Sequence, residues 1–386
     1  MSITLITTPT NPSPAYGPHI WTMDAGGLVF QTGFRYICEV FDGVNKIAEL
    51  KAEPHPLHGW GKIDTQSVIQ SFMTFNTSFT DTVFSVQDGW KTLRFDFGWE
   101  YEGTRVTGDT TSNRTVFNAS PPYTEFTEWQ SVQPYYLTGT AANKYPLTER
   151  RDIRTREGTK QWLYFWTASH TNVRLLEVRN NEDNTFQYID LPVGLRNNDL
   201  GRMTGWRVDK ETVDTLFSAD LQSWSARPIT EGSVPTAEYI NFSVKSCNRW
   251  NPFSLYWLNR WGGMDSLPFD GRSVQRIEGE REHYNRPQPR INTDGTADYD
   301  SALHSRRVYH SKARSRYRLT TDWLLEREQY ILDGLVSSPL VWMETEGKLL
   351  PVQLRTSSVE IRQAREGVLF AAIEVDYEDN TLRQRA

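Results

Sequence analysis

Apolar and polar residues alternate along much of the chain, and this spacing predicts β-strands. The run Phe34–Phe41 alternates residue by residue, a turn at Asp42-Gly43 follows, and Lys46–Lys51 returns. That order is typical of a β-hairpin. Further runs rich in β-branched and aromatic residues lie at 82–87, 92–100, 161–167, 173–179, 186–191 and 237–245. The chain is therefore predicted to be mainly β.

Two segments have the spacing of helices instead. Ile63–Phe75 places apolar residues on one face, and Thr320–Val336 has the strongest helical pattern in the chain. The apolar side of the second segment comprises Trp323, Leu324, Tyr330, Ile331 and Leu335. Thr321 or Asp322 could cap this helix, and Pro339 would stop it.

Proline, glycine and polar clusters divide the chain into four parts. Residues 1–18 are polar and proline-rich, and we expect an extended arm that lies on a neighbouring subunit. Residues 19–120 are predicted to form an immunoglobulin- or fibronectin-like β module, and residues 121–245 a second β module. Residues 246–386 are predicted to form an α+β module that closes with three strands. Within it, residues 279–318 are arginine-rich, and we expect a long excursion or loop.

Aromatic residues are unusually frequent, since 14 Trp, 17 Tyr and 18 Phe make up 13% of the 386 residues. Aromatic side chains favour strands and dominate both cores and interfaces. The tryptophans either fill cores and subunit interfaces or form exposed platforms on which sugar rings stack. The stacking candidates are Trp90, Trp99, Trp129, Trp162, Trp166, Trp206, Trp224, Trp250, Trp257 and Trp261. The sequence favours the core explanation and leaves the other open.

Charge and cysteine content argue against several classes of protein. The net charge is −6, whereas a sequence-independent nucleic-acid binder usually carries a basic face. Cys38 and Cys247 are far apart in the sequence, and we expect two buried free thiols rather than a disulfide. No signal peptide and no apolar run of membrane-spanning length is visible. We therefore expect a protein that is assembled in a cytoplasm, without a membrane partner.

Patterns for catalysis or metal binding are weak. His55 and His58 stand three residues apart, but no second pair follows, and zinc sites need three or four ligands. The sequence has no nucleophile elbow, no phosphate-binding glycine loop and no evident partner for His170. The carboxylates that could serve a glycoside hydrolase are Asp96, Glu100, Glu125 and Glu128, which suit a solvated surface equally well. We expect no cofactor, no metal and no enzymatic activity.

A basic stretch at the end of the excursion is the candidate interface. Arginines alternate with tyrosines there, and both residue types are enriched at protein interfaces. The candidate interface residues are Arg306, Arg307, Tyr309, Arg314, Arg316 and Tyr317. Three explanations stay open: a solvated loop, contact with an acidic partner subunit, or phosphate contact in the lumen of a connector.

Three segments resemble virion structural proteins of tailed bacteriophages, particularly phages of Bacteroidetes-type hosts. Leu255–Phe269 reads LYWLNRWGGMDSLPF and is similar to an LNR-GG-D-F core in those proteins. Thr320–Val352, with Trp323 and Pro339, resembles their terminal pattern. Phe34–Asp64 resembles their N-terminal immunoglobulin-like module. The middle of the chain is not covered by the resemblance.

The resemblance implies motif residues that define a fold rather than carry chemistry. These residues are Asn259, Arg260, Trp261, Gly262, Gly263 and Asp265, together with Trp323 and Pro339. Gly262 and Gly263 would permit a tight turn, which Asp265 could brace through its side chain. Arg260 could pair with a carboxylate or stack on Trp261.

The function implied by the resemblance is structural. We expect a component of a phage tail, baseplate or connector that self-associates into a ring and contacts other virion proteins. The alternative is a carbohydrate-binding receptor-recognition protein of the tail, with a host surface glycan as its partner. A glycan-degrading tail enzyme is a third hypothesis, and nucleic acid is not expected as the main partner.

Overall fold

The computed structural model divides into two compact units, which are described separately. Unit 1 comprises Met1–Ser246 together with Leu258–Ser266, and unit 2 comprises Cys247–Trp257 together with Leu267–Ala386. The structure describes the chain except for residues 1, 76–82, 86–88, 122–132, 138–143, 149, 168–172, 193–201, 246–252, 286–289, 299–305, 323, 326–327, 357–367, 370 and 385–386.

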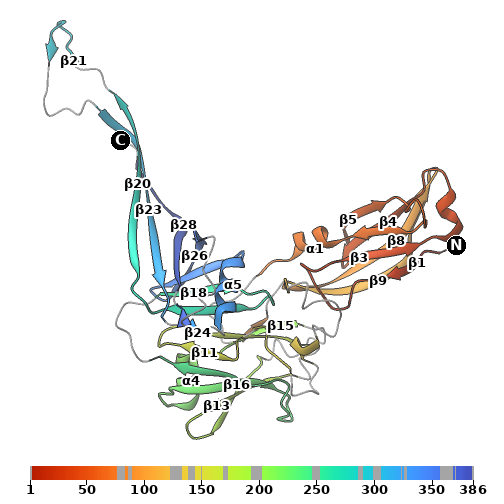
Figure 1. Cartoon of the computed structure of the whole chain (residues 1–386), viewed down its shortest axis with the longest axis horizontal. Coiled ribbons are helices and arrows are strands. Elements are labelled where there is room, and N and C mark those ends of the chain that lie inside the picture. Colours follow the sequence, from red (N-terminus) through yellow and green to blue (C-terminus); the bar gives the residue numbers. More distant parts are fainter. Residues whose placement is uncertain are drawn as a thin grey trace. The chain divides into compact units, whose positions relative to one another are not determined.

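Unit 1 begins with a two-sheet β-sandwich (Figure 1). One sheet has the strand order β2-β9-β8-β4-β5 and the other the order β1-β3-β6. The strands are β1 (Thr4–Thr7), β2 (Ser13–Pro14), β3 (Ile20–Asp24), β4 (Arg35–Asp42), β5 (Asn45–Ala52), β6 (Gly61–Asp64), β8 (Trp90–Tyr101) and β9 (Thr104–Phe117). A short 3-10 helix, η1 (Gly26–Phe30), precedes β4. β4 and β5 form the predicted hairpin, and α1 (Gln66–Phe72) is a shorter helix than the sequence pattern indicated.

The two sheets of the sandwich share one aromatic core. Trp21 of β3 packs against Phe95 and Phe97 of β8, with a ring-centroid distance of 4.9 Å in each pair. All three side chains are fully buried. Cys38 is also buried and is a free thiol, as predicted, and burial raises its pKa far above the ordinary value. Cys247 lies outside the described residues.

The proline-rich N-terminal segment is not a free arm, contrary to expectation. β1 pairs with β3, and β2 pairs in parallel with the end of β9. The backbone N–H of Ala15 donates to the carbonyl of Phe117 at 2.8 Å, and that of Thr115 donates to Asn11 Oδ1 at 2.9 Å. The segment therefore completes both sheets of its own sandwich.

His19 is a fully buried titratable group at the start of β3. Its Nε2 lies 2.8 Å from the carbonyl oxygen of Pro14, and its Nδ1 has no hydrogen-bond partner among the described residues. Because a carbonyl oxygen only accepts, Nε2 carries the proton of the neutral ring. Desolvation lowers the pKa of His19, against smaller opposing effects of the Pro14 hydrogen bond and of Asp64. The folded sandwich therefore favours the neutral imidazole.

Acid is expected to destabilise the sandwich through His19. Its pKa is lower in the folded than in the unfolded chain, so the stability is fully present above the unfolded value of about 6.5. Stability is then lost as the pH falls toward the folded pKa, by up to about 1.4 kcal/mol per pH unit. His19→Gln should flatten the slope between about pH 7 and pH 5 in urea titrations followed by hydrogen exchange of β3 and β4. An equal slope in both proteins would contradict this assignment.

The rest of unit 1 has two more sheets around a second core. Their orders are β10-β12-β15-β7 and β11-β17-β16-β13-β14, and α4 (Lys210–Phe217) packs on the same core. The strands are β7 (Val83–Ser85), β10 (Tyr136–Leu137), β11 (Asp152–Thr155), β12 (Trp162–Thr167), β13 (Leu175–Asn180), β14 (Phe186–Asp190), β15 (Arg202–Arg207), β16 (Ser223–Ile229) and β17 (Ile240–Val244). β7 precedes the expected boundary near residue 120, yet it pairs with β15.

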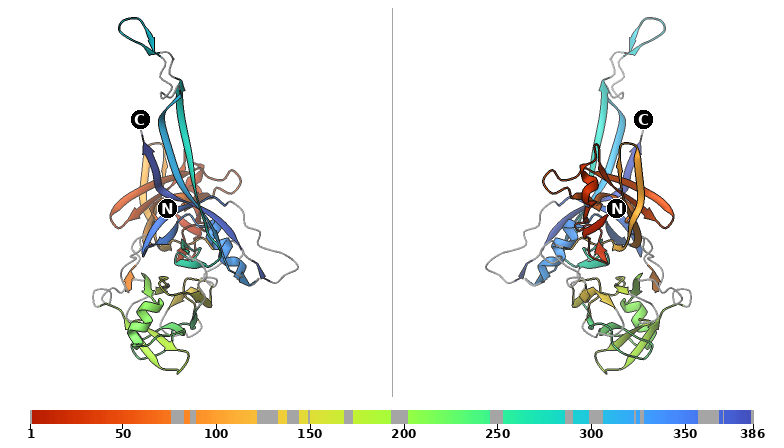
Figure 2. Two further views of the ribbon diagram at one scale, coloured as in Figure 1. Left: turned by 90° about the vertical axis from the view of Figure 1, so that its left-hand side faces the viewer. Right: turned by 90° about the vertical axis from the view of Figure 1, so that its right-hand side faces the viewer.

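Unit 2 is built on a seven-stranded sheet of order β19-β18-β25-β26-β28-β23-β20 (Figures 1 and 2). The strands are β18 (Phe253–Leu258), β19 (Met264–Phe269), β20 (Val274–Asn285), β23 (Arg306–Thr320), β25 (Val341–Thr345), β26 (Lys348–Leu354) and β28 (Ala372–Gln384). A small pair, β21 (Arg290–Ile291) and β22 (Ala297–Asp298), lies in the segment between β20 and β23. The core of this unit contains Trp257, Phe269 and Ile373 from the sheet, and Leu332 and Leu335 from α5.

The helix of unit 2 begins later than predicted. α5 spans Gln329–Ser337, and β24 (Leu324–Leu325) pairs with β27 (Val368–Leu369) where the helix was expected to begin. The predicted cap is also wrong, because Thr321 Oγ1 accepts the backbone N–H of Ala371 instead. The predicted end of the helix is confirmed, since α5 ends before Pro339.

The predicted fold class is confirmed. The protein is mainly β, with several sheets, a β-sandwich in its N-terminal part and a C-terminal sheet on which α5 packs. None of the helices in the described part of the chain is long and apolar enough to cross a membrane.

Candidate interaction surface

The motif segment 258–266 belongs to unit 1, where Asn259 organises it. Asn259 Oδ1 accepts the backbone N–H groups of Trp261 and Gly263, both at 3.0 Å. Its Nδ2 donates to the carbonyl of Leu147 at 2.7 Å, and its backbone N–H donates to the carbonyl of Gly263 at 2.8 Å. One buried amide side chain therefore holds the turn and joins it to the rest of unit 1.

Both glycines of the motif are required by close packing. Gly262 has a φ of +84°, and a Cβ built on it would lie 2.2 Å from the carbonyl oxygen of Asn118. A Cβ on Gly263 would lie 2.8 Å from the carbonyl oxygen of Leu147. The prediction that these glycines permit a tight turn is confirmed, and contact with neighbouring backbone is a second reason for them.

The remaining motif residues of this segment are also structural. The side chain of Asp265 accepts the hydroxyl of Thr148 at 2.7 Å, and its predicted role in bracing the turn stays a prediction. Trp261 is buried and stacks on Tyr135 with the ring centroids 3.9 Å apart. The backbone carbonyl of Arg260 accepts a hydrogen bond from another backbone N–H of unit 1. The segment is an internal element of unit 1 rather than a contact surface.

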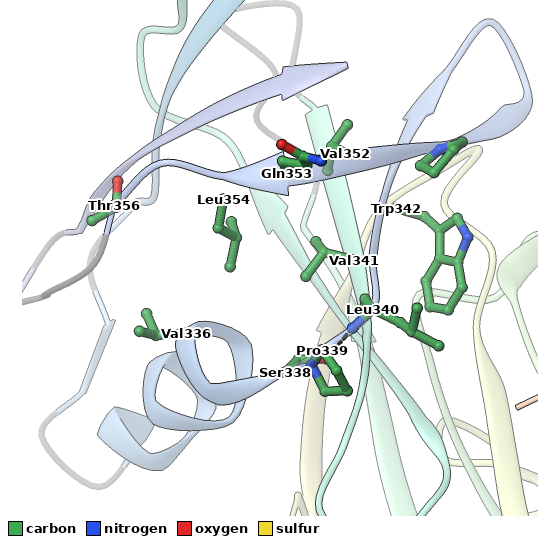
Figure 3. Close-up of a pocket in the computed structure, with 11 residues that line it drawn as sticks. Val336, Ser338, Pro339, Leu340, Val341, Trp342, Val352, Gln353, Leu354 and Thr356 are labelled. Carbon is green, nitrogen blue, oxygen red and sulfur yellow. Dashed lines mark hydrogen bonds between the residues drawn. The ribbon is translucent and has the colours of Figure 1, made fainter. Parts of the chain in front are cut away.

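Pro339, the other motif residue that the structure describes, lines an open pocket of about 500 Å³ in unit 2 (Figure 3). The pocket lies between the end of α5 and the β25–β26 hairpin. Its lining residues are Val336, Ser338, Pro339, Leu340, Val341, Trp342, Pro351, Val352, Gln353, Leu354 and Thr356. None of these side chains is charged, and Ser338, Gln353 and Thr356 give the pocket polar groups beside its apolar residues. Trp323 lies outside the described residues.

The arginine-rich excursion is a ribbon of strands where it is described, not a loop. β20 and β23 pair from Val274↔Arg318 to Asn285↔Arg306, and β28 pairs with the other side of β23. β20 is the outermost strand of the sheet as the structure describes it, and all 12 of its residues are exposed. Figure 1 shows β20 and β23 continuing beyond β18 and β26 of the same sheet. A strand of this length spans about 40 Å.

One face of the ribbon carries a row of carboxylates, here called the acidic ladder: Glu278, Glu280 and Glu282. The register places Arg314, Lys312 and His310 of β23 directly opposite these three residues. The other face of β20 carries Ile277, Gly279 and Arg281, and Ile277 is 73% exposed. Alternation in this segment therefore separates a charged face from a mixed face, and not a core face from a solvent face.

The outer candidate interface residues are exposed on this ribbon. Arg306 and Arg314 are exposed, and Tyr309 is 48% exposed. A hydrogen bond with Glu282 raises the pKa of Tyr309, which ties the tyrosine to the acidic ladder. The side chain of Arg307 lies outside the description.

The inner candidate interface residues anchor the ribbon instead. Arg316 pairs with Glu278 at 2.7 Å and with Asp376 at 3.3 Å. Tyr317 packs edge-on against Phe253 and Tyr377, and burial raises its pKa to about 12. The predicted interface therefore combines exposed residues with residues that attach the ribbon to its sheet.

The tryptophans proposed as sugar platforms are mostly core residues. Those that are buried are Trp99, Trp162, Trp166, Trp206, Trp224, Trp257 and Trp261. Trp90 is half-buried, and Trp129 and Trp250 lie outside the described residues. Aromatic abundance in this chain therefore reflects large cores.

One exposed tryptophan was missed by the sequence analysis. Trp60 is 46% exposed and stacks on His58 at 5.0 Å, and His58 stacks on His55 at 5.3 Å. Leu57 in the same loop is 83% exposed. The loop runs between β5 and β6. Its prolines and glycines could have indicated from the sequence that Trp60 lies in an exposed loop.

Within the described part of the chain, no three His, Cys, Asp or Glu side chains are grouped so that they could hold a metal ion. Asp96 accepts a hydrogen bond from Thr111, and Glu100 pairs with Lys51 at 2.8 Å. The other candidates lie outside the described residues, and they are Glu125, Glu128 and His170.

Comparisons with known proteins add little. Neither a scan against protein-family models nor a search of curated proteins finds a match. A solved ectodomain of the teleost fish polymeric Ig receptor is similar over 63% of this chain and 98% of its own, at 9% identity and a TM-score of 0.19. The extracellular region of Plexin A4 is similar over 97% of this chain and 40% of its own, at 9% identity and a TM-score of 0.22. These scores carry no argument, and the resemblance to virion proteins stays a prediction.

Proposed function

We propose that this protein is a non-enzymatic structural component of a tailed-phage virion. It would act in the tail, baseplate or connector ring by self-association and by contact with other virion proteins. The observation that carries the proposal is the β20–β23 ribbon, whose outermost strand is exposed along all 12 residues. The sequence resemblance of Leu255–Phe269 and Thr320–Val352 supports the virion assignment.

An open strand edge suits assembly because its outward N–H and C=O groups are unused within the sheet. Most proteins shorten, cover or charge such an edge, since it otherwise pairs with any available strand. β20 is long and is the outermost strand of the sheet in the described structure, and its charges restrict pairing to a strand of matching charge. Backbone hydrogen bonds at such an edge supply affinity, and the alternating side chains select the partner.

The test is quantitative mass spectrometry of purified particles that contain this chain. A constant copy number per particle, in the ratio of a symmetric ring, is the expected result. Ordinary contamination would give a copy number that varies between preparations and falls with further purification. A chain that is lost from the particles on repeated purification would overturn the proposal.

A carbohydrate-binding receptor-recognition protein is the second candidate, because Trp60 is an exposed aromatic ring in a loop with Leu57. Aromatic faces stack on sugar rings, and binding would quench or shift the fluorescence of Trp60. Purified host surface glycan is the probe, with Trp60→Ala as the variant that should lose the response. Trp90→Phe is the matched control at a half-buried position. An unchanged spectrum at saturating glycan would exclude this candidate.

A further inference from the structure

We infer that the edge of β20 binds an extended segment of a partner protein whose basic side chains stand at alternate positions. This inference rests on the proposed function and specifies the chemistry of the partner. Three observations carry it: the open edge, the acidic ladder, and the sequence of the strand that already pairs with β20.

The existing neighbour of β20 shows what kind of strand fits the acidic ladder. Opposite Glu278, Glu280 and Glu282, β23 places a basic residue or a histidine at each position. Opposite charges that face each other across neighbouring strands stabilise pairing, and like charges destabilise it. The carboxylates lie on β20 itself, so a strand on its open side meets the same row of charge as β23 does. Basic residues at alternate positions would match it there too.

The residues between the basic ones are also constrained. They would share the face that carries Ile277 and Gly279, where β23 has Ser315 and Ala313 at the corresponding positions. Gly279 leaves room for a neighbouring side chain, and Ile277 gives an exposed apolar contact. Small or β-branched residues therefore fit the intervening positions.

The charge pattern argues against a second copy of β20 as the occupant. Two copies of β20 can pair antiparallel about a two-fold axis that is perpendicular to the sheet. Each side chain then stays on its own face, so even-numbered residues face even-numbered residues of the other copy. An axis through any residue from 278 to 282 then places carboxylates of the ladder opposite each other. Such like-charge pairs are unfavourable. Charge therefore disfavours a second copy of β20 that pairs about an axis anywhere within the acidic ladder, and only a shorter overlap centred on Ile277 would face Glu278 with Arg276.

The direct probe is a synthetic peptide with the sequence of residues 310–318, HSKARSRYR, labelled for fluorescence anisotropy with the full chain. We expect saturable binding that weakens as salt is raised. A peptide of the same composition with its basic residues moved to one end should bind at least about tenfold more weakly, because it no longer matches the ladder.

Backbone methylation separates strand pairing from simple charge attraction. In an added antiparallel strand, alternate N–H groups point to β20 and the others point away. N-methylation of one alternate set of peptide residues should therefore abolish binding, and methylation of the other set should preserve it. Equal binding by the two methylated peptides would overturn the inference, because attraction by charge alone does not distinguish them.

Variants of the chain test the ladder itself. Glu278→Gln with Glu280→Gln and Glu282→Gln should weaken peptide binding about tenfold or more, through three lost charge pairs. The control replaces Glu102, Glu182 and Glu346, three exposed turn residues, by glutamine and changes the net charge equally. Hydrogen exchange of β23 in both variants checks that the ribbon keeps its fold after loss of the Glu278–Arg316 pair.

The outcomes separate this inference from the proposed function. If the copy number of this chain per particle is constant but the alternating peptide does not bind, the proposed function is supported and the inference is wrong. Peptide binding by a chain that is not a particle component would do the reverse. If light scattering shows a dimer without peptide, and the β20 amides are protected in it, a second copy occupies the edge and the inference is wrong.

Discussion

Gly262→Ala is expected to destabilise unit 1 by about 2–5 kcal/mol. The positive φ of +84° strains a residue with a side chain, and the new Cβ would lie 2.2 Å from the carbonyl oxygen of Asn118. That neighbour is backbone, so relief requires a shift of the chain itself. Hydrogen exchange across a urea series, read on peptides from β12 and β15, measures the loss.

The matched control for this prediction is Gly158→Ala. Gly158 has a similar φ of +77°, but no atom lies within 4 Å of a Cβ built there. Gly158→Ala should lower the free energy of unfolding only by the cost of backbone strain at positive φ, about 1–2 kcal/mol. Equal losses in the two variants would show that close packing at Gly262 is not what requires glycine.

Asn259→Ala is the second large prediction, with an expected loss of about 3–5 kcal/mol from unit 1. The change removes the acceptor for two backbone N–H groups and the donor for the carbonyl of Leu147. Asn259 is only 7% exposed, so water does not readily replace these bonds. The same urea and exchange experiment measures the effect.

An exposed asparagine of the same unit provides the comparison. Asn113 lies on β9 with its side chain exposed, and Asn113→Ala should change stability by less than about 0.5 kcal/mol. If Asn259→Ala is equally mild, the motif turn is held by its backbone bonds and by Trp261, and the central role assigned to the amide is wrong.

Local pattern predicted much of the fold. The hairpin β4–β5, the closing strands β25, β26 and β28, and the end of α5 all follow from alternation, turn residues or a proline stop. α4 was missed, although Asp209 caps it through a hydrogen bond from the N–H of Thr212. The short segment between β15 and β16 was included in a β module because its surroundings are strands. The start of α5 was wrong because tertiary pairing of β24 with β27 overrode helical spacing.

Part of the ribbon on which the proposed interaction surface lies was located from the sequence. Composition identified the basic stretch. It was interpreted as a loop because neither side of the segment is apolar, and an apolar face is the usual signal for a strand. The resemblance indicated a strand at Arg276–Tyr284, but its pairing with β23, and so the position of the acidic ladder opposite basic residues, was recognised only from the register. The role of Asn259 was likewise invisible, because its contact with Leu147 joins residues 112 positions apart.

The position of residues 258–266 has a consequence for the order of folding during synthesis. These residues are made after the rest of unit 1, yet they supply the amide that binds Leu147 and the turn that packs on Asn118. When only the first 246 residues have left the ribosome, the carbonyl groups of Leu147 and Asn118 do not yet have Asn259 and Gly262 as neighbours. Unit 1 can therefore be completed only after residues 258–266 have been translated.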